Sequence, residues 1–186
     1  MLIRERVDTD LPRLEEILHT TYERDGYPFR AESVSAGWLV RHGDLAWVLV
    51  VDGVVVGHVA LHLSVDGGPS GEGSSGDGAE IVRYFVAPEA RGTGGASLLL
   101  QRALAEAYER AGDAWLVVMP HNTRAVAAYA RAGLVPDGET SWTDVEGVEH
   151  PLLRFRASGS RAPSIPAPAR PRQVAGATSR DSDSGV

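Results

Sequence analysis

A glycine-rich turn between a predicted strand and a predicted helix constrains the fold of this chain more than any other feature. Apolar and β-branched residues predominate in the segment 80–86 and run up to Pro88, which cannot continue a hydrogen-bonded strand. A helical pattern covers about 94–111. Because the turn at 91–96 has little side-chain bulk, several backbone amides can face one point at the positive end of the helix dipole. This order of strand, turn and helix is typical of a phosphate site.

Three phosphate-binding patterns can be compared with this turn. A P-loop needs Lys followed by Ser or Thr after its last glycine, and the chain contains no Lys, because all 18 basic residues are Arg. A dinucleotide fingerprint needs a third glycine and an acidic residue ending the next strand, but Ser97 follows the turn and Met119 ends that strand. The third pattern, Arg/Gln-x-x-Gly-x-Gly/Ala, is filled by Arg91, Gly94 and Ala96. A glycine turn that merely begins a helix is the structural alternative.

At these residues the sequence resembles the GCN5-related N-acetyltransferase (GNAT) superfamily, in which this loop binds the pyrophosphate of acetyl-CoA. The resemblance covers roughly 2–156 and includes Tyr84-Phe85-Val86 before the loop, with Asn122 and Tyr129 after it. It implies a mixed α+β fold. The expected sheet is central and mostly antiparallel, with six to seven strands, one parallel pair at the cofactor cleft and about four flanking helices.

The expected elements follow the order of that superfamily. A short strand at 2–7 precedes helices at 12–25 and 32–41 and a hairpin of strands at 45–51 and 54–63. The pair Asp52-Gly53 between these strands is a strong signal for a two-residue hairpin turn. After the strand at 80–86 and the helix at 94–111, we expect a strand at 114–119, a helix at 122–133 and a hairpin of 134–143 with 148–156. The helical crossover makes the strands at 80–86 and 114–119 parallel.

The composition divides the chain into one domain and a tail. We expect an acetyltransferase domain over 1–156, with a flexible Gly/Ser-rich loop at 66–78. Residues 157–186 are rich in Arg, Pro, Ser and Ala and have almost nothing large to bury, so a disordered tail is expected there.

Charge and cysteine content exclude several classes of function. The chain has no Cys, so disulfides, thiolate metal sites and an acyl-cysteine intermediate are excluded. Residues 1–156 carry 14 Arg and 23 acidic residues, a net charge of −9, which argues against a nucleic-acid partner and for a cationic amine. The charged N-terminus and the lack of a long apolar run predict a cytoplasmic protein without a membrane partner.

The resemblance implies a role for each part of the cofactor site. Backbone amides from Arg91 to Ala96 would hold the diphosphate, and the Arg91 side chain would add a charge-assisted contact. The residues implied in cofactor binding are Tyr84, Phe85, Val86, Arg91, Gly92, Thr93, Gly94, Gly95, Ala96 and Asn122. The first three would pair with the pantetheine arm, and the Val86 amide would donate to the thioester oxygen. Tyr129, two helical turns after Asn122, would be the general acid.

The acceptor side carries a weaker signal. The ribosomal-protein alanine acetyltransferases of the superfamily have a Glu five residues before the Asn, where this chain has Val117. Glu80 is therefore the first candidate for the base and His58 the second, each acting through a water. Either side chain could instead make a structural ion pair or hydrogen bond. Tyr27 and Phe29 are candidates for the wall of the acceptor site, or could simply anchor their loop.

These observations predict an N-acetyltransferase that moves an acetyl group from acetyl-CoA to a primary amine of a small molecule or peptide. Because the chain has no Cys, direct attack in a ternary complex is expected. The alternative is a non-catalytic acyl-CoA-binding module, although retention of Asn122 and Tyr129 favours the enzyme. A third alternative, a translation-blocking toxin that acetylates aminoacyl-tRNA, would need a basic groove for RNA, and the net charge of −9 over residues 1–156 argues against it. No metal is expected, and the chain would be a monomer or homodimer.

Overall fold

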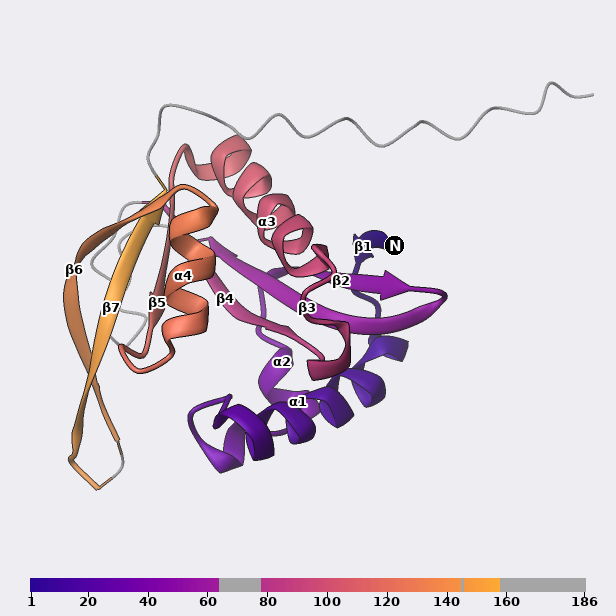
Figure 1. Cartoon of the computed structure of the whole chain (residues 1–186), viewed down its shortest axis with the longest axis horizontal. Helices are drawn as coiled ribbons and strands as arrows, with labels where there is room; N and C mark the ends of the chain where they lie inside the picture. Colours follow the sequence, from indigo (N-terminus) through magenta and orange to yellow (C-terminus); the bar gives the residue numbers. More distant parts are fainter. Residues whose placement is uncertain (64–77, 145, 158–186) are drawn as a thin grey trace, which may run out of the picture.

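The described residues of the protein fold around one twisted sheet of seven strands (Figure 1). The computed structural model describes residues 1–63, 78–144 and 146–157, so most of the expected loop at 66–78 and nearly all of the expected tail lie outside the described residues. The strand order is β1-β2-β3-β4-β5-β7-β6, and only β4 and β5 run parallel. The mixed α+β architecture expected from the sequence is confirmed.

The strands and helices of the described residues lie close to their expected positions. The strands are β1 (Leu2–Glu5), β2 (Leu45–Val51), β3 (Val54–Leu63), β4 (Ala79–Val86), β5 (Ala114–Val118), β6 (Leu134–Thr143) and β7 (Glu149–Ala157). The helices are α1 (Leu11–Asp25), α2 (Ala36–Leu39), α3 (Gly95–Ala111) and α4 (Thr123–Arg131). Both α1 and α3 end at a glycine in the left-handed conformation, Gly26 and Gly112. Glycine tolerates that conformation without steric cost.

The second predicted helix is shorter than expected. Instead of a helix over 32–41, the chain forms a 3₁₀ turn (Ala31–Ser33) and then the single turn of α2. Ser35 interrupts the helix because its extended backbone and its Oγ, which accepts from the Trp38 amide at 3.3 Å, make it an N-cap.

The hairpin of β2 and β3 turns at Asp52 and Gly53, both of which have positive φ, at 49° and 81°. Two positive φ values define a type I′ turn, which suits the right-handed twist of the paired strands. The sequence prediction of this turn is confirmed.

Helices cover both faces of the sheet, with α3 and α1 on opposite sides (Figure 1). Leu14, Ile17 and Leu18 bury the apolar face of α1, and Leu99, Leu100 and Leu104 bury that of α3. Within the described residues, no helix is both long and apolar enough to cross a membrane.

Strand β4 separates from β5 soon after the two strands begin to pair. Their pairing is confined to Ala79 with Ala114 and Glu80 with Trp115. Farther along β4, the register with β3 shifts between His58 and Ala60, where Arg83 has a positive φ of 50°. Such a bulge bends its strand and increases the local twist. The carboxyl ends of the parallel strands therefore diverge, and Glu80 lies at the point where they part.

Candidate functional site

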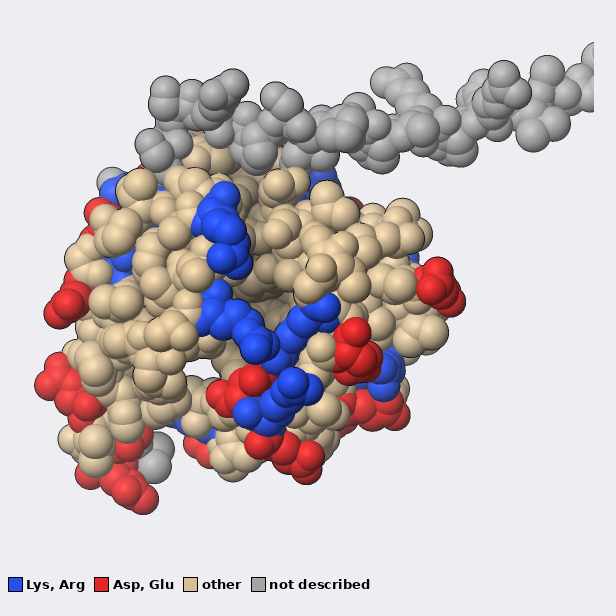
Figure 2. Space-filling model, viewed as in Figure 1, with Lys and Arg blue, Asp and Glu red and all other residues tan. Residues whose placement is uncertain are grey.

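Beyond Glu80 the strands β4 and β5 are no longer paired, and we call the space between them the opening. The free edge of β4 supplies backbone groups to this opening. The Ala87 amide donates to the Val56 carbonyl at 2.8 Å, and Val86 is paired with Gly57. Because bonded and non-bonded pairs alternate in an antiparallel ladder, the amide of Val86 points away from β3. Because Phe85 pairs with His58 on the Val86 side of the bulge, the same alternation turns the amide of Tyr84 outward. Two donors on β4 thus face the opening, and Figure 2 shows the surface hollowed near the middle of this view, with Arg side chains around the hollow.

The glycine-rich turn ends in an uncapped helix N-terminus. Gly92 and Gly94 have positive φ values of 80° and 86°, so the turn depends on glycine at both positions. The N-cap residue Gly94 offers no side chain to α3, and the side chain that reaches the first turn is that of Thr93, whose Oγ1 accepts from the Gly95 amide at 3.5 Å. Thr93 bonds within the turn, because its Oγ1 donates to the Ala90 carbonyl at 2.9 Å. The amides of Ala96 and Ser97 thus remain for an anion at the positive end of the helix dipole.

Gly95 allows α3 to approach the sheet closely. A Cβ at this position would lie 2.6 Å from Cδ2 of Leu49, a contact too short for any side chain. The sequence predicted a glycine turn here. The contact with β2 gives Gly95 a packing role as well.

Arg91 is held by two groups of the protein. Its Nε donates to the carbonyl of Val86 at 3.1 Å, and another guanidinium nitrogen is 2.5 Å from the Asp25 carboxylate. The side chain therefore ties the end of β4 to the end of α1. The expected contact of this guanidinium with a phosphate would have to compete with the ion pair to Asp25.

Two tyrosines and one asparagine lie on the α3 and α4 side of the opening. The Tyr84 hydroxyl donates to the Ala96 carbonyl at 2.8 Å, which links β4 to the first turn of α3. The Tyr129 ring is 6.2 Å from that of Tyr84, and burial raises the pKa of Tyr129. Asn122 caps α4, because its Oδ1 accepts from the Ala125 amide at 3.1 Å. The structure thus brings together the expected acid and both cofactor residues.

The two aromatic residues of the loop after α1 face different surroundings. Tyr27 contacts Phe85 and Trp38, with ring centroids 6.2 and 6.0 Å apart. Burial is the largest cause that raises the pKa of Tyr27, and the charge that Tyr129 would carry adds to the shift. Phe29 instead packs edge-on against Trp142 of β6, at 4.9 Å. Tyr27 thus packs beside β4 and α2, where an acceptor wall was expected, and Phe29 connects its loop to the closing hairpin.

His58 lies in the core, where an acceptor amine cannot reach it. Its side chain has no exposed surface, Nδ1 is 2.8 Å from the Arg83 carbonyl, and the ring stacks on Phe85 at 5.5 Å. Burial lowers the pKa of His58 to about 4, against a weaker opposing effect of the Arg83 carbonyl. The structure thus favours the structural alternative for His58 over the role of base.

Glu80 belongs to a polar cluster that the sequence did not reveal. It is half-buried, and burial raises the pKa of its carboxyl, while the charges of His62, Arg41 and Arg83 oppose that shift. Asp44 bonds His62 Nδ1 at 2.8 Å and Arg83 at 2.5 Å. The sequence shows no spacing that links Asp44 to His62, because they meet only through the pairing of distant segments.

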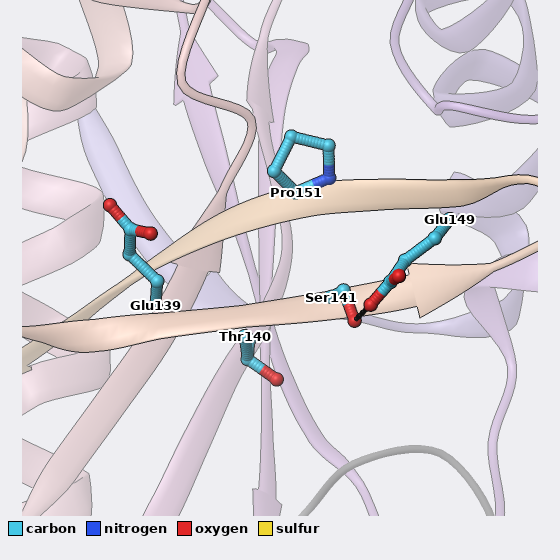
Figure 3. Close-up of a pocket in the computed structure, with 5 residues that line it drawn as sticks. All are labelled: Glu139, Thr140, Ser141, Glu149 and Pro151. Carbon is cyan, nitrogen blue, oxygen red and sulfur yellow. Dashed lines mark hydrogen bonds between the residues drawn. The ribbon is translucent and has the colours of Figure 1, made fainter.

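A shallow groove lies elsewhere, on the β6–β7 hairpin. Figure 3 shows its lining, which consists of Glu139, Thr140, Ser141, Glu149 and Pro151. The Ser141 hydroxyl bonds the Glu149 carboxylate. None of these residues was expected in a site, and none belongs to the opening at β4. In the described part of the chain, no group of three or more His, Asp or Glu side chains is arranged to hold a metal ion.

Comparisons with known proteins identify the relatives of this fold. The family model described as "Acetyltransferase (GNAT) family" matches residues 11–134. Ribosomal-protein-alanine N-acetyltransferase from Brucella melitensis is 23% identical, with a TM-score of 0.65 over 84% of this chain and 98% of that one. A mutant of spermidine N-acetyltransferase SpeG from Vibrio cholerae is 20% identical, with a TM-score of 0.62 over 88% and 98%.

A third similar structure was solved with a ligand. Arabidopsis thaliana NAA60 in complex with acetyl-CoA is 22% identical to this chain, with a TM-score of 0.61. The alignment covers 83% of this chain and 96% of that one. The search among curated proteins found no match.

Proposed function

Because this chain belongs to the acetyltransferase (GNAT) family, we propose that it transfers the acetyl group of acetyl-CoA to a primary amine of a small molecule or peptide. One observation carries the proposal: the uncapped N-terminus of α3 and the free edge of β4 lie on the same opening. The first suits a diphosphate, and the second suits an extended arm that contains amides. Acetyl-CoA has both groups in one molecule.

The proposed binding mode assigns the two free amides of β4 to different parts of the cosubstrate. Tyr84 is closer to Glu80 along β4 than Val86 is, and its ring is beside Tyr129. We therefore assign the thioester oxygen to the Tyr84 amide and the pantetheine arm to the Val86 amide, in place of the assignment expected from the sequence. A backbone amide aimed at the thioester oxygen stabilises the negative charge that develops there. The amide nitrogen of Asn122 is available for the arm.

Tyr129 is proposed as the general acid. Its buried hydroxyl has a raised pKa and stays protonated at neutral pH. In the described part of the chain no hydrogen bond engages this hydroxyl, so its proton is available to the departing thiolate. The expelled sulfur takes the proton as the C–S bond breaks, and CoA leaves as a thiol.

Glu80 is proposed as the base that deprotonates the acceptor ammonium. Its raised pKa brings it closer to that of an amine than an exposed carboxylate would be. Glu80 precedes Tyr84 by four positions, up to about 13 Å along an extended strand, so water molecules would carry the proton. Tyr27 forms the wall beside the acceptor. Relatives named for protein N-terminal alanine and for spermidine set the range of acceptors to be tried.

Two measurements test the proposal. Calorimetry with acetyl-CoA should register binding, and Gly94→Arg, which fills the turn, should abolish it. A screen of polyamines, amino acids, aminoglycosides and peptides, read by mass spectrometry, should yield an acetylated product. Initial rates should give intersecting double-reciprocal lines, as direct attack requires. Binding without any acetylated product would favour the non-catalytic acyl-CoA-binding module, and absence of binding would refute both. Cytoplasmic location and a monomeric or dimeric state stay predictions.

A further inference from the structure

An aspartate–histidine pair lies beside Glu80 and has no part in the mechanism above. Asp44, in the loop before β2, accepts from Nδ1 of His62 on β3 at 2.8 Å. The Asp44 side chain is 2% exposed, and that of His62 is 14% exposed. The second oxygen of Asp44 accepts from Arg83 at 2.5 Å. Arg83 in turn donates from Nε to the Trp38 carbonyl at 2.6 Å. The carboxylate is therefore fixed on both oxygens.

The bond to Asp44 determines which nitrogen of His62 can accept a proton. A carboxylate only accepts hydrogen bonds, so Nδ1 of the neutral ring must carry the hydrogen. Nε2 is then the acceptor, and in the part of the chain that the structure describes no hydrogen bond engages it. A buried aspartate that holds a histidine in one tautomer also stabilises the imidazolium formed when that ring gains a proton.

The sheet places His62 directly next to Glu80. The two residues are register partners on β3 and β4. Partners directly opposite in an antiparallel pair have Cβ atoms about 4.5–5.5 Å apart and point to the same face. This makes the imidazole and the Glu80 carboxylate neighbours on one face of the sheet, at the point where β4 and β5 part. The other charged groups that act on Glu80 are Arg41, Arg83 and Asp44.

We propose that His62, oriented by Asp44, receives the proton that Glu80 takes from the acceptor amine. The inference rests on the proposed function. An N–H bond of the ammonium breaks, and through water the proton reaches a Glu80 oxygen, which leaves the nitrogen lone pair free to attack the thioester carbon. The O–H bond at Glu80 then breaks as Nε2–H forms on His62, and the imidazolium later loses its proton to water. Glu80 is thereby returned to its charged form for the next turnover.

The arrangement also explains why a half-buried carboxylate can act repeatedly. Burial favours the protonated form of Glu80. Without a neighbouring proton acceptor, a proton on the Glu80 carboxyl would have to leave directly to solvent. Asp44 fixes the tautomer of His62 and supplies a buried negative charge next to it. The His62 ring is itself partly exposed, so it can pass a proton from Glu80 to water. His62 acts through Glu80 and is therefore a positioning and relay residue, not a group that touches the acceptor.

The test compares variants of the full chain with the amine found by the screen. His62→Gln should lower kcat about tenfold or more, since a positioned proton acceptor contributes at least that much. KM for the amine and the Kd for acetyl-CoA should stay within about threefold. His62→Ala should lose the same activity and regain part of it when free imidazole is added, which a structural role would not allow. His19→Gln, an exposed histidine on α1, is the matched control and should keep wild-type activity.

The outcomes separate this inference from the proposed function. Wild-type activity together with full activity of His62→Gln would overturn the relay and leave the acetyltransferase intact. Loss of activity in His62→Ala without rescue by imidazole would also overturn it. A fall in kcat with an unchanged melting temperature, reversed by imidazole, would support the relay. If the wild-type chain transfers no acetyl group to any amine, the proposed function fails and the inference fails with it.

Discussion

The rings of Tyr84 and Tyr129 lie 6.2 Å apart at an interplanar angle of 42°, but within the described residues only the Tyr84 hydroxyl of the two has a hydrogen bond. That bond, to the Ala96 carbonyl at 2.8 Å, ties β4 to the first turn of α3. Tyr129 contacts Phe155 on its other side, with centroids 6.0 Å apart. Tyr84 therefore joins two elements of the proposed cofactor site, and Tyr129 is the phenol that we propose as the proton donor.

Tyr129→Phe should lower kcat by about 10²-fold or more, because the thiolate would leave without a proton donor. The ring and its contacts with Tyr84 and Phe155 are retained, so the Kd for acetyl-CoA should stay within a few-fold. Steady-state kinetics and calorimetry measure the two quantities. Tyr22→Phe, which removes a hydroxyl from α1 outside the opening, serves as the control. An unchanged kcat in Tyr129→Phe would dismiss the role of acid.

Gly95→Ala should lower the free energy of unfolding by about 1–3 kcal/mol, the usual cost of overpacking. The added Cβ would meet Leu49 Cδ2 at 2.6 Å, so α3 must move outward, and acetyl-CoA should bind more weakly. Leu49→Ala removes the obstructing methyl, so the double variant should cost less than the sum of the two single changes. Urea unfolding measures all three.

Gly94→Ala is the matched control for that cycle. Its Cβ would meet nothing within 4 Å, but its φ of 86° strains any residue with a side chain. Leu49→Ala should therefore give Gly94→Ala no relief. If Leu49→Ala reduced the destabilisation by Gly94→Ala as much as that by Gly95→Ala, the short contact at Gly95 would not be the cause of the lost stability.

Local sequence signals predicted most helices, strands and turns. They did not predict contacts between residues that are distant in the sequence. Asp52-Gly53 fixes its hairpin because both residues accept positive φ. The bulge at Arg83 carries no such signal, since Arg is an unusual residue for a φ of 50°. The bond of Asp44 to Arg83 joins the loop before β2 to that bulge, and the bond of Asp44 to His62 joins the same loop to β3. The surroundings of the proposed base could therefore not be worked out from the sequence, whereas the glycine turn could, and the role of Tyr129 stays a prediction.

Phe29→Ala should raise KM for the acceptor several-fold and leave the Kd for acetyl-CoA unchanged. The ring packs on Trp142 at 4.9 Å and on His150 at 4.7 Å, which holds the loop of Tyr27 against the closing hairpin. Trp142→Ala should have the same effect, and the double variant should add little. Val54→Ala, an exposed apolar residue on β3, should change neither constant. Weaker binding of acetyl-CoA in Phe29→Ala would place the loop on the cofactor side instead.

The protein should lose stability as the pH falls from 6.5 towards 4, and His58 should account for much of the loss. Burial lowers the pKa of His58 from 6.5 to about 4, so folding favours the neutral ring. Stability from this source is complete above pH 6.5 and declines as the unfolded chain takes up a proton that the folded chain refuses. The difference amounts to about 3 kcal/mol at full extent. Asp10 does not account for a loss of stability in this pH range, because the hydrogen bond from Arg4 holds the pKa of its carboxyl below 3.8.

His58→Asn separates this effect from that of other groups. The amide nitrogen can still donate to the Arg83 carbonyl, and the side chain does not titrate in this range. Urea unfolding at pH 7, 5.5 and 4.5 should give a steeper loss for the wild type than for His58→Asn, even if the variant is less stable at pH 7. Parallel curves for the two proteins would mean that His58 is protonated in the folded state, and its assignment as a buried neutral histidine would be wrong.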